Sequence, residues 1–547
     1  MADKSTNNIE LKALVDKGSN KVIFIEPDND FVDVLFSFMT IPMGTIIRLA
    51  RKHSDPVAIG CMNNLYASVE NIGKQKFWIP KCKGMLLHPR NAADAHCNLL
   101  KLKLDDAKPR EYYVCISASK FLSFDWPICC PCPCSSVIND EKCLWLRPSQ
   151  VGSVFVKGEI RFTVTDDLQV IPPSASTNSV FTKLGVMDMD ATEELTVNIG
   201  TVEMINLLMS SLVSKTPLTE TLLKPKQEPK LSSKVINQAI HLESQMFGDS
   251  TNDEEGKISV KLVVSKSEKM VCYAEAGEDF VSLLFSFLTL PLGFILKNMK
   301  DGSLRGCISH LYKTIQDLDG QYMISNHHNE MILDPKLVPG FCYKNSLLGI
   351  EETSYYLVNN MLTTDRSLIS SEPNQLKVIG KMDDSALGFL KGPAMFVVTD
   401  NLVVRPISRI VELHLLKDLN VPVTDIEDQI VHVGKKEWHA FAIATSELHG
   451  QTPRQMANGS FSGISVSFSR VHRISASFSR VHRVSVFLSR VHGVSVSFSR
   501  VHRVSVFLSR VHRVSVSFSR VHRVSVSFNR IHRVSVSLAV FTGFLCS

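Results

Sequence analysis

A dense group of cysteines contains the residues best suited to chemistry. The stretch YYVCISASKFLSFDWPICCPCPC places Cys115 upstream of four more cysteines, and Cys143 follows nine residues after the last of them. Thiolates at short spacing can close a tetrahedral shell around a zinc ion, and the intervening prolines would fix the turns. The sequence therefore predicts a zinc site made by Cys115, Cys129, Cys132 and Cys134. The alternative is a cysteine-rich surface loop without a ligand.

A pair of adjacent aspartates offers a second kind of chemistry. Asp166 and Asp167 lie in the stretch TDDL, between two runs rich in β-branched residues. Two neighbouring carboxylates can act as an acid–base pair or hold a divalent cation. They also suit a two-residue hairpin turn, because aspartate tolerates turn geometry. The later stretch TDNL has Asn401 in place of one carboxylate and keeps the turn chemistry, so the sequence favours the turn.

The neighbouring His327 and His328 are the third candidate. With Glu330 in SNHHNEM they could bind a metal, but no second ligand group accompanies them at helical spacing, which favours an exposed polar loop. The motifs Gly-x4-Gly-Lys-Ser/Thr, Gly-x-Gly-x2-Gly, His-Glu-x2-His and Gly-x-Ser-x-Gly do not occur. The sequence therefore assigns no catalytic residue and no cofactor-binding residue.

One apolar segment occurs twice, as DFVDVLFSFMTIPMG from Asp30 and as DFVSLLFSFLTLPLG from Asp279. Its few polar residues recur at intervals of four and three, which indicates a helix with one narrow polar stripe. The proline and glycine that close each copy end the helix after about 16 Å, roughly half of the ~30 Å needed to cross a bilayer. Each copy is therefore predicted to be a buried helix preceded by a β-hairpin, and no membrane span is expected.

Further matching stretches extend this duplication through most of the chain. GCMNNLYASVENI pairs with GCISHLYKTIQDL, and FVKGEIRFTVTDDLQVIP pairs with FLKGPAMFVVTDNLVVRP, in the same order. Helical and strand patterns mix within each unit, which predicts an α+β fold of two homologous tandem units plus a low-complexity basic tail. The expected domains are a first unit 8–222, a linker 223–257, a second unit 258–449 with a degenerate end, and ten-residue repeats over 460–539.

The order of these stretches resembles a plant family known as domain of unknown function 674. The resemblance rests on the FVxxLFSFxTxPxG block, the FxKGxxxFxVTDxLxV block and SLVSKTPLTETLL at 211–223, and it covers almost all of residues 8–449. It implies tandem copies of one unit and no assigned activity. The second unit has no cysteine where the first has its cluster, so a shared fold does not require the metal.

The last part of the chain repeats SFSRVHRVSV with a period of ten residues. From Ser460 onward it contains thirteen arginines and no acidic residue, so removing it from the net charge of +6 leaves −7 for residues 1–459. Such a basic repeat could bind nucleic acid or an anionic membrane, or its alternation could form a β-solenoid. The sequence favours a disordered extension or a translated nucleotide repeat, because no Gly or Asn turns punctuate it.

The chain start shows no secretory signal, which predicts a cytosolic or nuclear protein with its thirteen cysteines reduced. Together the patterns predict a non-catalytic binding or scaffolding protein whose two related units pack together or share a partner, either a protein or a small molecule. The alternatives are a zinc-supported interaction module in the first unit, and an enzyme with an unrecognised site. Nucleic acid is a partner only through the basic tail.

Overall fold

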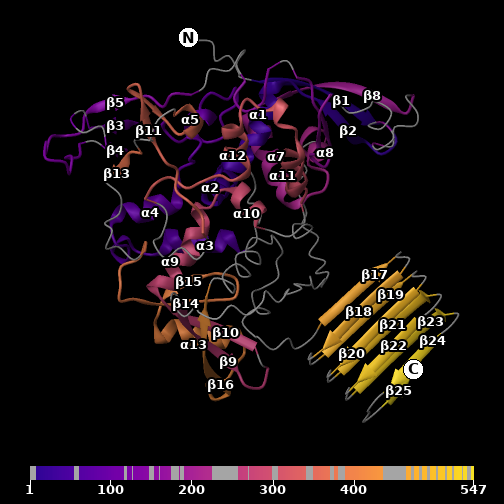
Figure 1. The fold of residues 1–547 in the computed structure, drawn as a ribbon. Coiled ribbons are helices and arrows are strands. Elements are labelled where there is room, and N and C mark those ends of the chain that lie inside the picture. Colours follow the sequence, from indigo (N-terminus) through magenta and orange to yellow (C-terminus); the bar gives the residue numbers. More distant parts are fainter. Residues whose placement is uncertain are drawn as a thin grey trace. The chain divides into compact units, whose positions relative to one another are not determined.

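The computed structural model describes most of residues 8–434 and the strands of residues 464–546 (Figure 1). The longer stretches outside the described residues are 54–60, 147–152, 174–180, 185–189, 224–256, 299–305, 341–348, 370–374, 380–387 and 435–463, which include the predicted linker and the degenerate end of the second unit. The chain divides into two compact units, one of residues 1–227 and 254–453 and one of residues 228–253 and 454–547. The larger unit is α+β and holds both copies of the duplication, which we call the first half (8–222) and the second half (258–434).

Each half contains a five-stranded antiparallel sheet with the same strand order. The order is β7-β6-β2-β1-β8 in the first half and β15-β14-β10-β9-β16 in the second. Buried and exposed residues alternate along β1, so one face of its sheet is covered by the helices. The strands are β1 (Ile9–Asp16), β2 (Lys21–Glu26), β6 (Thr163–Thr165), β7 (Val170–Ile171), β8 (Thr192–Ile199), β9 (Ile258–Ser265), β10 (Met270–Gly277), β14 (Met395–Val398), β15 (Val404–Pro406) and β16 (Ile426–Val433).

The repeated apolar segment forms a buried helix in each half, as predicted. Helices α1 (Asn29–Ser37) and α9 (Glu278–Ser286) each continue into one turn of 3-10 helix and end before the proline. Every residue of 31–40 and of 281–290 is buried. The polar stripe is satisfied internally, because Ser37 donates to the Val34 carbonyl at 2.6 Å. Among the described residues, no helix has the length and apolar character that a membrane span requires.

The remaining helices follow the core helix in the same general order in the two halves. The first half adds α2 (Met43–His53), α3 (Met62–Asn71), α4 (Pro80–Leu87), α5 (Asp94–Cys97), α7 (Thr201–Val213) and α8 (Pro217–Leu222). The second half adds α10 (Leu292–Lys297), α11 (Ile308–Asp317), α12 (Asn326–Leu333) and α13 (Arg409–Asp418).

The two proline–glycine breaks lie against each other. Pro42 and Pro291 form an antiparallel β-bridge. The N–H of Met43 donates to the residue before Pro291 at 2.9 Å, and the N–H of Leu292 donates to the residue before Pro42 at 3.0 Å. The breaks therefore end the helices and also join the halves, because the backbone groups released there bond to each other.

Glycine is required on both sides of this crossing. A Cβ on Gly44 would lie 2.9 Å from the carbonyl oxygen of Leu288. A Cβ on Gly293 would lie 2.7 Å from the carbonyl oxygen of Ile332 and 3.0 Å from that of Met39. These are backbone atoms that cannot rotate away, so the close approach excludes any side chain at either position.

Asp33 ties the core helix of the first half to the FVKG segment. Its carboxylate accepts three backbone N–H bonds from residues 154–156, at 2.6, 2.8 and 2.9 Å. Burial raises the pKa of Asp33 to about 6, although these three bonds lower it. The corresponding Ser282 of the second half accepts one N–H from Leu390 at 3.2 Å. The first half therefore has the stronger form of a bond that both halves make.

The halves exchange contacts in both directions. Near the β14–β15 turn of the second half, the N–H of Val404 donates to Ser68 of α3 at 2.9 Å. Near the β6–β7 turn of the first half, His310 of α11 lies 3.0 Å from the carboxylate of Asp167. A helix of each half therefore contacts the sheet of the other half, and in this sense the two halves interleave.

A third sheet of the larger unit is composite. Strand β13 of the second half pairs in parallel with β4 of the first, in the order β13-β4-β3-β5, and their labels lie together in Figure 1. Tyr112 of β3 packs against Tyr355 of the second half, with ring centroids 5.8 Å apart. Arg110 donates to the Tyr355 hydroxyl at 2.9 Å. The strands here are β3 (Tyr112–Val114), β4 (Phe121–Ser123), β5 (Asp140–Lys142) and β13 (Lys377–Ile379), with a separate hairpin β11 (Tyr356–Val358) and β12 (Met361–Thr363).

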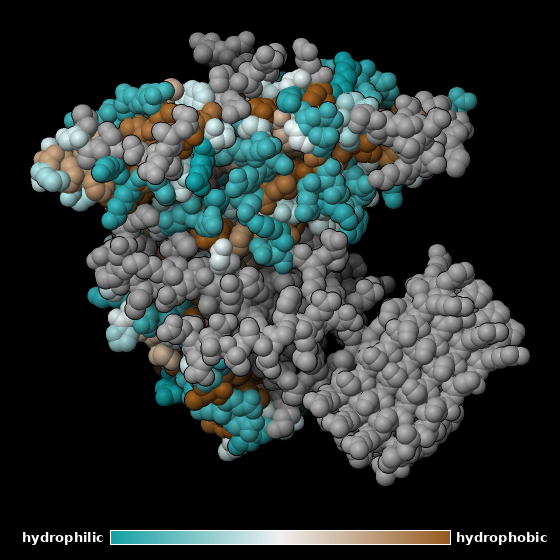
Figure 2. Space-filling view, in the orientation of Figure 1, coloured by the Kyte–Doolittle hydropathy of each residue, from teal (hydrophilic) through white to brown (hydrophobic). Residues whose placement is uncertain are grey.

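Apolar side chains are exposed near the edge of the second-half sheet. Ile410 and Leu413 of α13 are 66% and 54% exposed, and Ile430 of β16 is 70% exposed. Figure 2 shows brown, apolar surface among teal where Figure 1 labels α13 and β16. Strand β16 is the last strand in the described order of its sheet.

The smaller unit contains strands of the ten-residue repeats. They form two parallel sheets, in which each strand pairs with the strand twenty residues away. This pairing is the one expected of a β-solenoid, which the even repeat period allows. The domain bounds given from the sequence, and the disorder expected over 460–539, stay predictions. The strands are β17 (Ile464–Ser469), β18 (Arg473–Ser479), β19 (Arg483–Ser489), β20 (Gly493–Ser499), β21 (Arg503–Val511), β22 (Val514–Ser519), β23 (Arg523–Ile531), β24 (Val534–Leu538) and β25 (Phe544–Cys546).

The close contact of the two proline–glycine breaks predicts that two glycine substitutions differ in their effect on the free energy of unfolding. Gly293→Ala should lower the free energy of unfolding by about 2 kcal/mol, because the backbone must shift to admit the methyl group. Gly84→Ala is the matched control, since Gly84 lies within α4 and no atom stands within 4 Å of the point that a Cβ would occupy there. It should leave stability unchanged or slightly raised. Urea denaturation measures both, and equal stabilities would contradict the close approach.

Replacement of Asp33 tests the bonds to residues 154–156. Asp33→Ala should lower the free energy of unfolding by about 3 kcal/mol, because three buried N–H groups lose their acceptor. Ser282→Ala removes the single, longer bond of the second half and should cost about 1 kcal/mol. Denaturant midpoints at pH 7 measure both variants. Equal stability of Asp33→Ala and Ser282→Ala would contradict the role given to the three bonds.

Candidate metal centre

Four cysteine sulphurs of the first half lie within 4.8 Å of one another. They belong to Cys115, Cys130, Cys132 and Cys134. Cys115 is 3.8 Å from both Cys132 and Cys134, which matches the edge of about 3.8 Å in a tetrahedron of sulphurs bound at about 2.3 Å. Cys132 is closer to its neighbours, 3.0 Å from Cys130 and 2.7 Å from Cys134. These four cysteines can hold a metal ion.

Short backbone-paired turns position the four sulphurs. Cys115 follows β3, and its N–H donates to Phe121 of β4 at 3.1 Å, which continues the β3–β4 pairing. The other three cysteines come from one loop between β4 and β5, which folds back so that the N–H of Cys130 donates to the Ser136 carbonyl at 2.9 Å. Pro131 lies between Cys130 and Cys132, and Pro133 lies between Cys132 and Cys134. The fixed φ of each proline restricts the loop further. These backbone bonds bring the four cysteines to one place in the fold.

The thiols of the group differ in acidity. Hydrogen bonds from the Cys132 thiol and the Ser136 N–H lower the pKa of Cys134 to about 6. Burial raises the pKa of Cys130 to about 12, and the Cys134 thiol raises that of Cys132. The group thus favours one thiolate near neutral pH, and a bound cation would lower the pKa of the remaining thiols.

The structure brings together three of the four cysteines singled out from the sequence. Cys115, Cys132 and Cys134 belong to the group, and Cys130 supplies the fourth sulphur. Cys129 is exposed and forms a backbone bridge with Val137. Successive side chains of an extended segment point to opposite sides, so only one of two adjacent cysteines can face the other three. The sequence shows that one of the pair must turn away but does not show which one.

The donor set determines what this centre can bind. Four thiolates with no oxygen or nitrogen ligand suit a soft or borderline ion such as zinc or iron and are unsuited to magnesium or calcium. Four protein ligands complete a tetrahedral shell, so no coordination position is left for a substrate. Among the described residues, no other group of three or more His, Cys, Asp or Glu side chains has its ligand atoms close enough to hold a metal.

The paired aspartates of TDDL serve a turn, as the sequence favoured. Asp166 accepts bonds from the N–H and hydroxyl of Thr219 at 2.9 and 2.6 Å. Asp167 accepts from Thr165 and lies 3.0 Å from His310. The connection from β6 to β7 is four residues long, with Leu168 at φ 61°, so it is longer than the expected two-residue turn. Both carboxylates are occupied by the fold and do not face each other across a substrate site.

The expected exposed loop around His327 and His328 is wrong. Both residues lie in helix α12, and His328 is only 2% exposed. Its ring meets that of His96 edge to face, with centroids 5.2 Å apart, so a first-half histidine joins the pair. Glu330 instead pairs with Lys336 at 3.6 Å. The sequence missed His96 because nothing in its neighbourhood distinguishes it from a surface histidine.

The buried His96 is held in its neutral form. It is 5% exposed and stacks beside Phe155, with ring centroids 6.4 Å apart. Burial lowers the pKa of His96 to about 3, and the neighbouring His328 and His327 add to the effect. His96 is therefore an uncharged member of this contact between α5 of the first half and α12 of the second.

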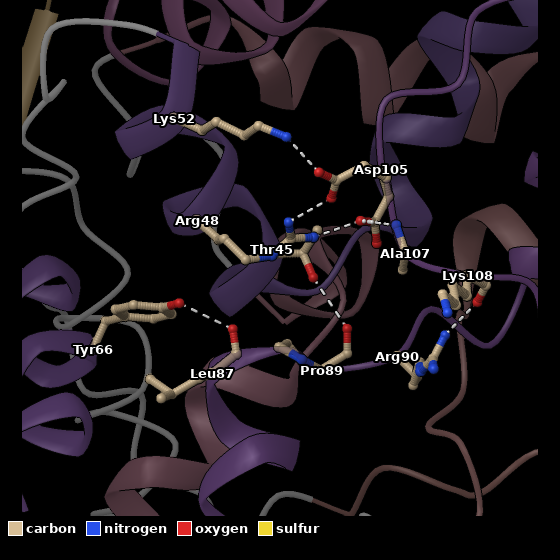
Figure 3. Close-up of polar contacts among 11 residues, drawn as sticks. Thr45, Arg48, Lys52, Tyr66, Leu87, Pro89, Arg90, Asp105, Ala107 and Lys108 are labelled. Carbon is tan, nitrogen blue, oxygen red and sulfur yellow. Dashed lines mark hydrogen bonds and ion pairs between the residues drawn. The ribbon is translucent and has the colours of Figure 1, made fainter.

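A small cavity of about 40 Å³ lies beside an ion-paired loop of the first half. Arg48 and Lys52 extend from α2 toward this loop (Figure 3), where Arg48 contacts Asp105 and Asp106 at 2.5 and 2.7 Å. The ion pair with Lys52, together with that of Arg48, holds the pKa of Asp106 far below its usual value. A cavity of this volume has room for about two or three waters. It is too small for a metabolite.

A family model for proteins of unknown function, DUF674, matches residues 5–436. The chain belongs to this family. The resemblance noted in the sequence is thereby confirmed, and the match runs through both halves of the larger unit. No curated protein and no solved structure matches the chain. Membership of DUF674 brings no activity with it, so the geometry of the cysteine group carries the functional argument.

The neutral His96 predicts an acid-dependent loss of stability in this DUF674 protein. Its pKa is about 3 when folded and about 6.5 when unfolded, so between these values only the unfolded chain takes up the proton. The stabilising contribution is complete above pH 6.5 and is lost as the pH falls toward 3. Between pH 7 and pH 5 the loss should reach about 2 kcal/mol.

Denaturation at several pH values, compared between wild type and His96→Phe, measures this contribution. The variant should show a shallower loss of stability on acidification, and His414→Gln, at an exposed residue of α13, should behave as wild type. Identical pH profiles for wild type and His96→Phe would show that His96 does not titrate in the unfolding reaction.

Proposed function

We propose that this protein is a non-catalytic binding or scaffolding protein, and that zinc held by Cys115, Cys130, Cys132 and Cys134 supports its first half. The proposal rests on the grouping of four sulphurs within 4.8 Å. A site closed by four thiolates is typical of structural zinc, whereas catalytic zinc keeps a position open for water or substrate. The ion would therefore organise the loop between β4 and β5.

The other polar groups support a binding role over a catalytic one. Asp166 and Asp167 accept bonds that build a turn, and Asp33 accepts three backbone bonds. The two carboxylates that the sequence offered as an acid–base pair are therefore occupied by the fold. An enzyme with an unrecognised site is the alternative, and turnover of any metabolite by the purified protein would favour it.

Location and partners follow from the same chemistry. Eleven cysteines of the described residues form no disulfide, which suits the reducing cytosol or nucleus, where thiolates are available to a metal. The partner is a protein or a small molecule. Nucleic acid is a partner only through the basic repeats, in which the strand register places Arg483, Arg503 and Arg523 side by side. Absence of salt-dependent binding to DNA or RNA by the full chain would exclude it.

Metal analysis of the full-length protein tests the zinc site. Protein purified under reducing conditions without chelator should contain about one zinc per chain, since four thiolates form one complete shell. Cys132→Ser removes the sulphur nearest two others and should abolish stoichiometric zinc. Cys129→Ser changes the adjacent exposed cysteine and should retain it, which makes it the matched control.

Two results would contradict the zinc assignment. If protein expressed in zinc-replete medium contained no metal, the proposed site would be wrong. Iron in place of zinc, seen as visible thiolate-to-iron absorption, would keep the four ligands and replace the ion.

A further inference from the structure

We propose that metal binding at the cysteine centre controls the pairing of the two halves in the composite sheet. The inference rests on the proposed metal site and adds a consequence for the second half. Among the described strands, β13 of the second half pairs with β4 alone, in parallel over three residues, and β4 also pairs with β3. The cysteine group is built at the ends of β3 and β4, so its state bears directly on the strand to which β13 binds.

The two faces of the composite sheet are covered in different ways. On one face, Tyr112 and Val114 of β3 pack with Leu122 and with second-half residues that include Tyr355. On the other face, Tyr113 and Phe121 pack against the cysteine group. Because side chains alternate along a strand, the first face is closed by an aromatic and aliphatic cluster and the second by the cysteines.

The second half contributes directly to the cysteine face. Ile379 of β13 packs against the cluster of Cys115, Cys130, Cys132 and Ile138. A three-residue strand is too short to be stable on backbone bonds alone and needs a packed face. Ordering of the sulphurs by an ion would therefore fix the surface on which Ile379 rests. Loss of the ion would free that surface and weaken the pairing of β13.

The corresponding hairpin of the second half needs no metal. There β11 and β12 lead into Asp365, which accepts bonds from the N–H and hydroxyl of Ser367 at 2.9 and 2.6 Å. Thr363 of β12 also accepts the Asp365 N–H at 3.1 Å. The first half makes the same bond, from the Asp125 N–H to Ser123 at 3.1 Å, and only the first half has cysteines in the span that follows this turn. Dependence on an ion is thus confined to one of the two hairpins, and the composite sheet connects that hairpin to the other half.

Hydrogen–deuterium exchange of the full-length protein tests this coupling. The N–H of Lys377 donates to Lys120 at 2.7 Å, so a peptide covering residues 375–379 reports the pairing of β13. Removal of the metal with a zinc chelator under reducing conditions should raise exchange in this peptide at least tenfold, and added zinc should reverse it. Peptides from β9 and β10, whose sheet shares no strand with the composite sheet, should keep their protection.

Two variants distinguish the effect of metal loss on β13 from general unfolding of the protein. Cys132→Ser should show the fast exchange of residues 375–379 without chelator, and Cys129→Ser should exchange as wild type before and after chelation. Bound zinc that can be removed with no change in this peptide would overturn the coupling and leave the metal site standing. Equal acceleration in β9 and β10 would also overturn it, because the effect would then be global unfolding. Protein that never binds metal would remove the proposed site and the coupling together.

Discussion

The structure of the larger unit depends on the contact of two backbone segments at Pro42 and Pro291. Each proline ends a buried helix and leaves backbone groups without helical partners, and these groups bond across the pair at 2.9 and 3.0 Å. Gly44 and Gly293 allow the chains to come this close. One local device, copied once, therefore ends both core helices and joins the two halves.

The interleaving follows from that contact. With the core helices joined at their ends, each half places a helix against the turn of the opposite sheet, as Ser68 and His310 show. The FVKG and FLKG stretches extend this exchange, because Val156 bridges Met323 of the second half and Leu390 bridges Phe77 of the first. Both copies therefore belong to one compact unit of the chain.

The copies have nevertheless diverged where polar chemistry stabilises them. The first half has a cysteine group, and the corresponding span of the second half contains no cysteine. Asp33 of the first half accepts three backbone bonds, whereas Ser282 of the second half accepts one. Both solutions occupy polar atoms that would otherwise be buried without partners.

The sequence by itself determined the buried helices, the duplicated order of segments along the chain, the turn at Asp166 and the cysteine-rich segment, because periodicity, proline placement and residue type act locally. Only the tertiary structure decided which cysteine faces inward and which histidines meet. Cys130 replaces Cys129 because the alternation of side chains is set by pairing with the strand opposite. His96 meets His328 because the halves interleave, and contacts between distant segments leave no local pattern in the chain.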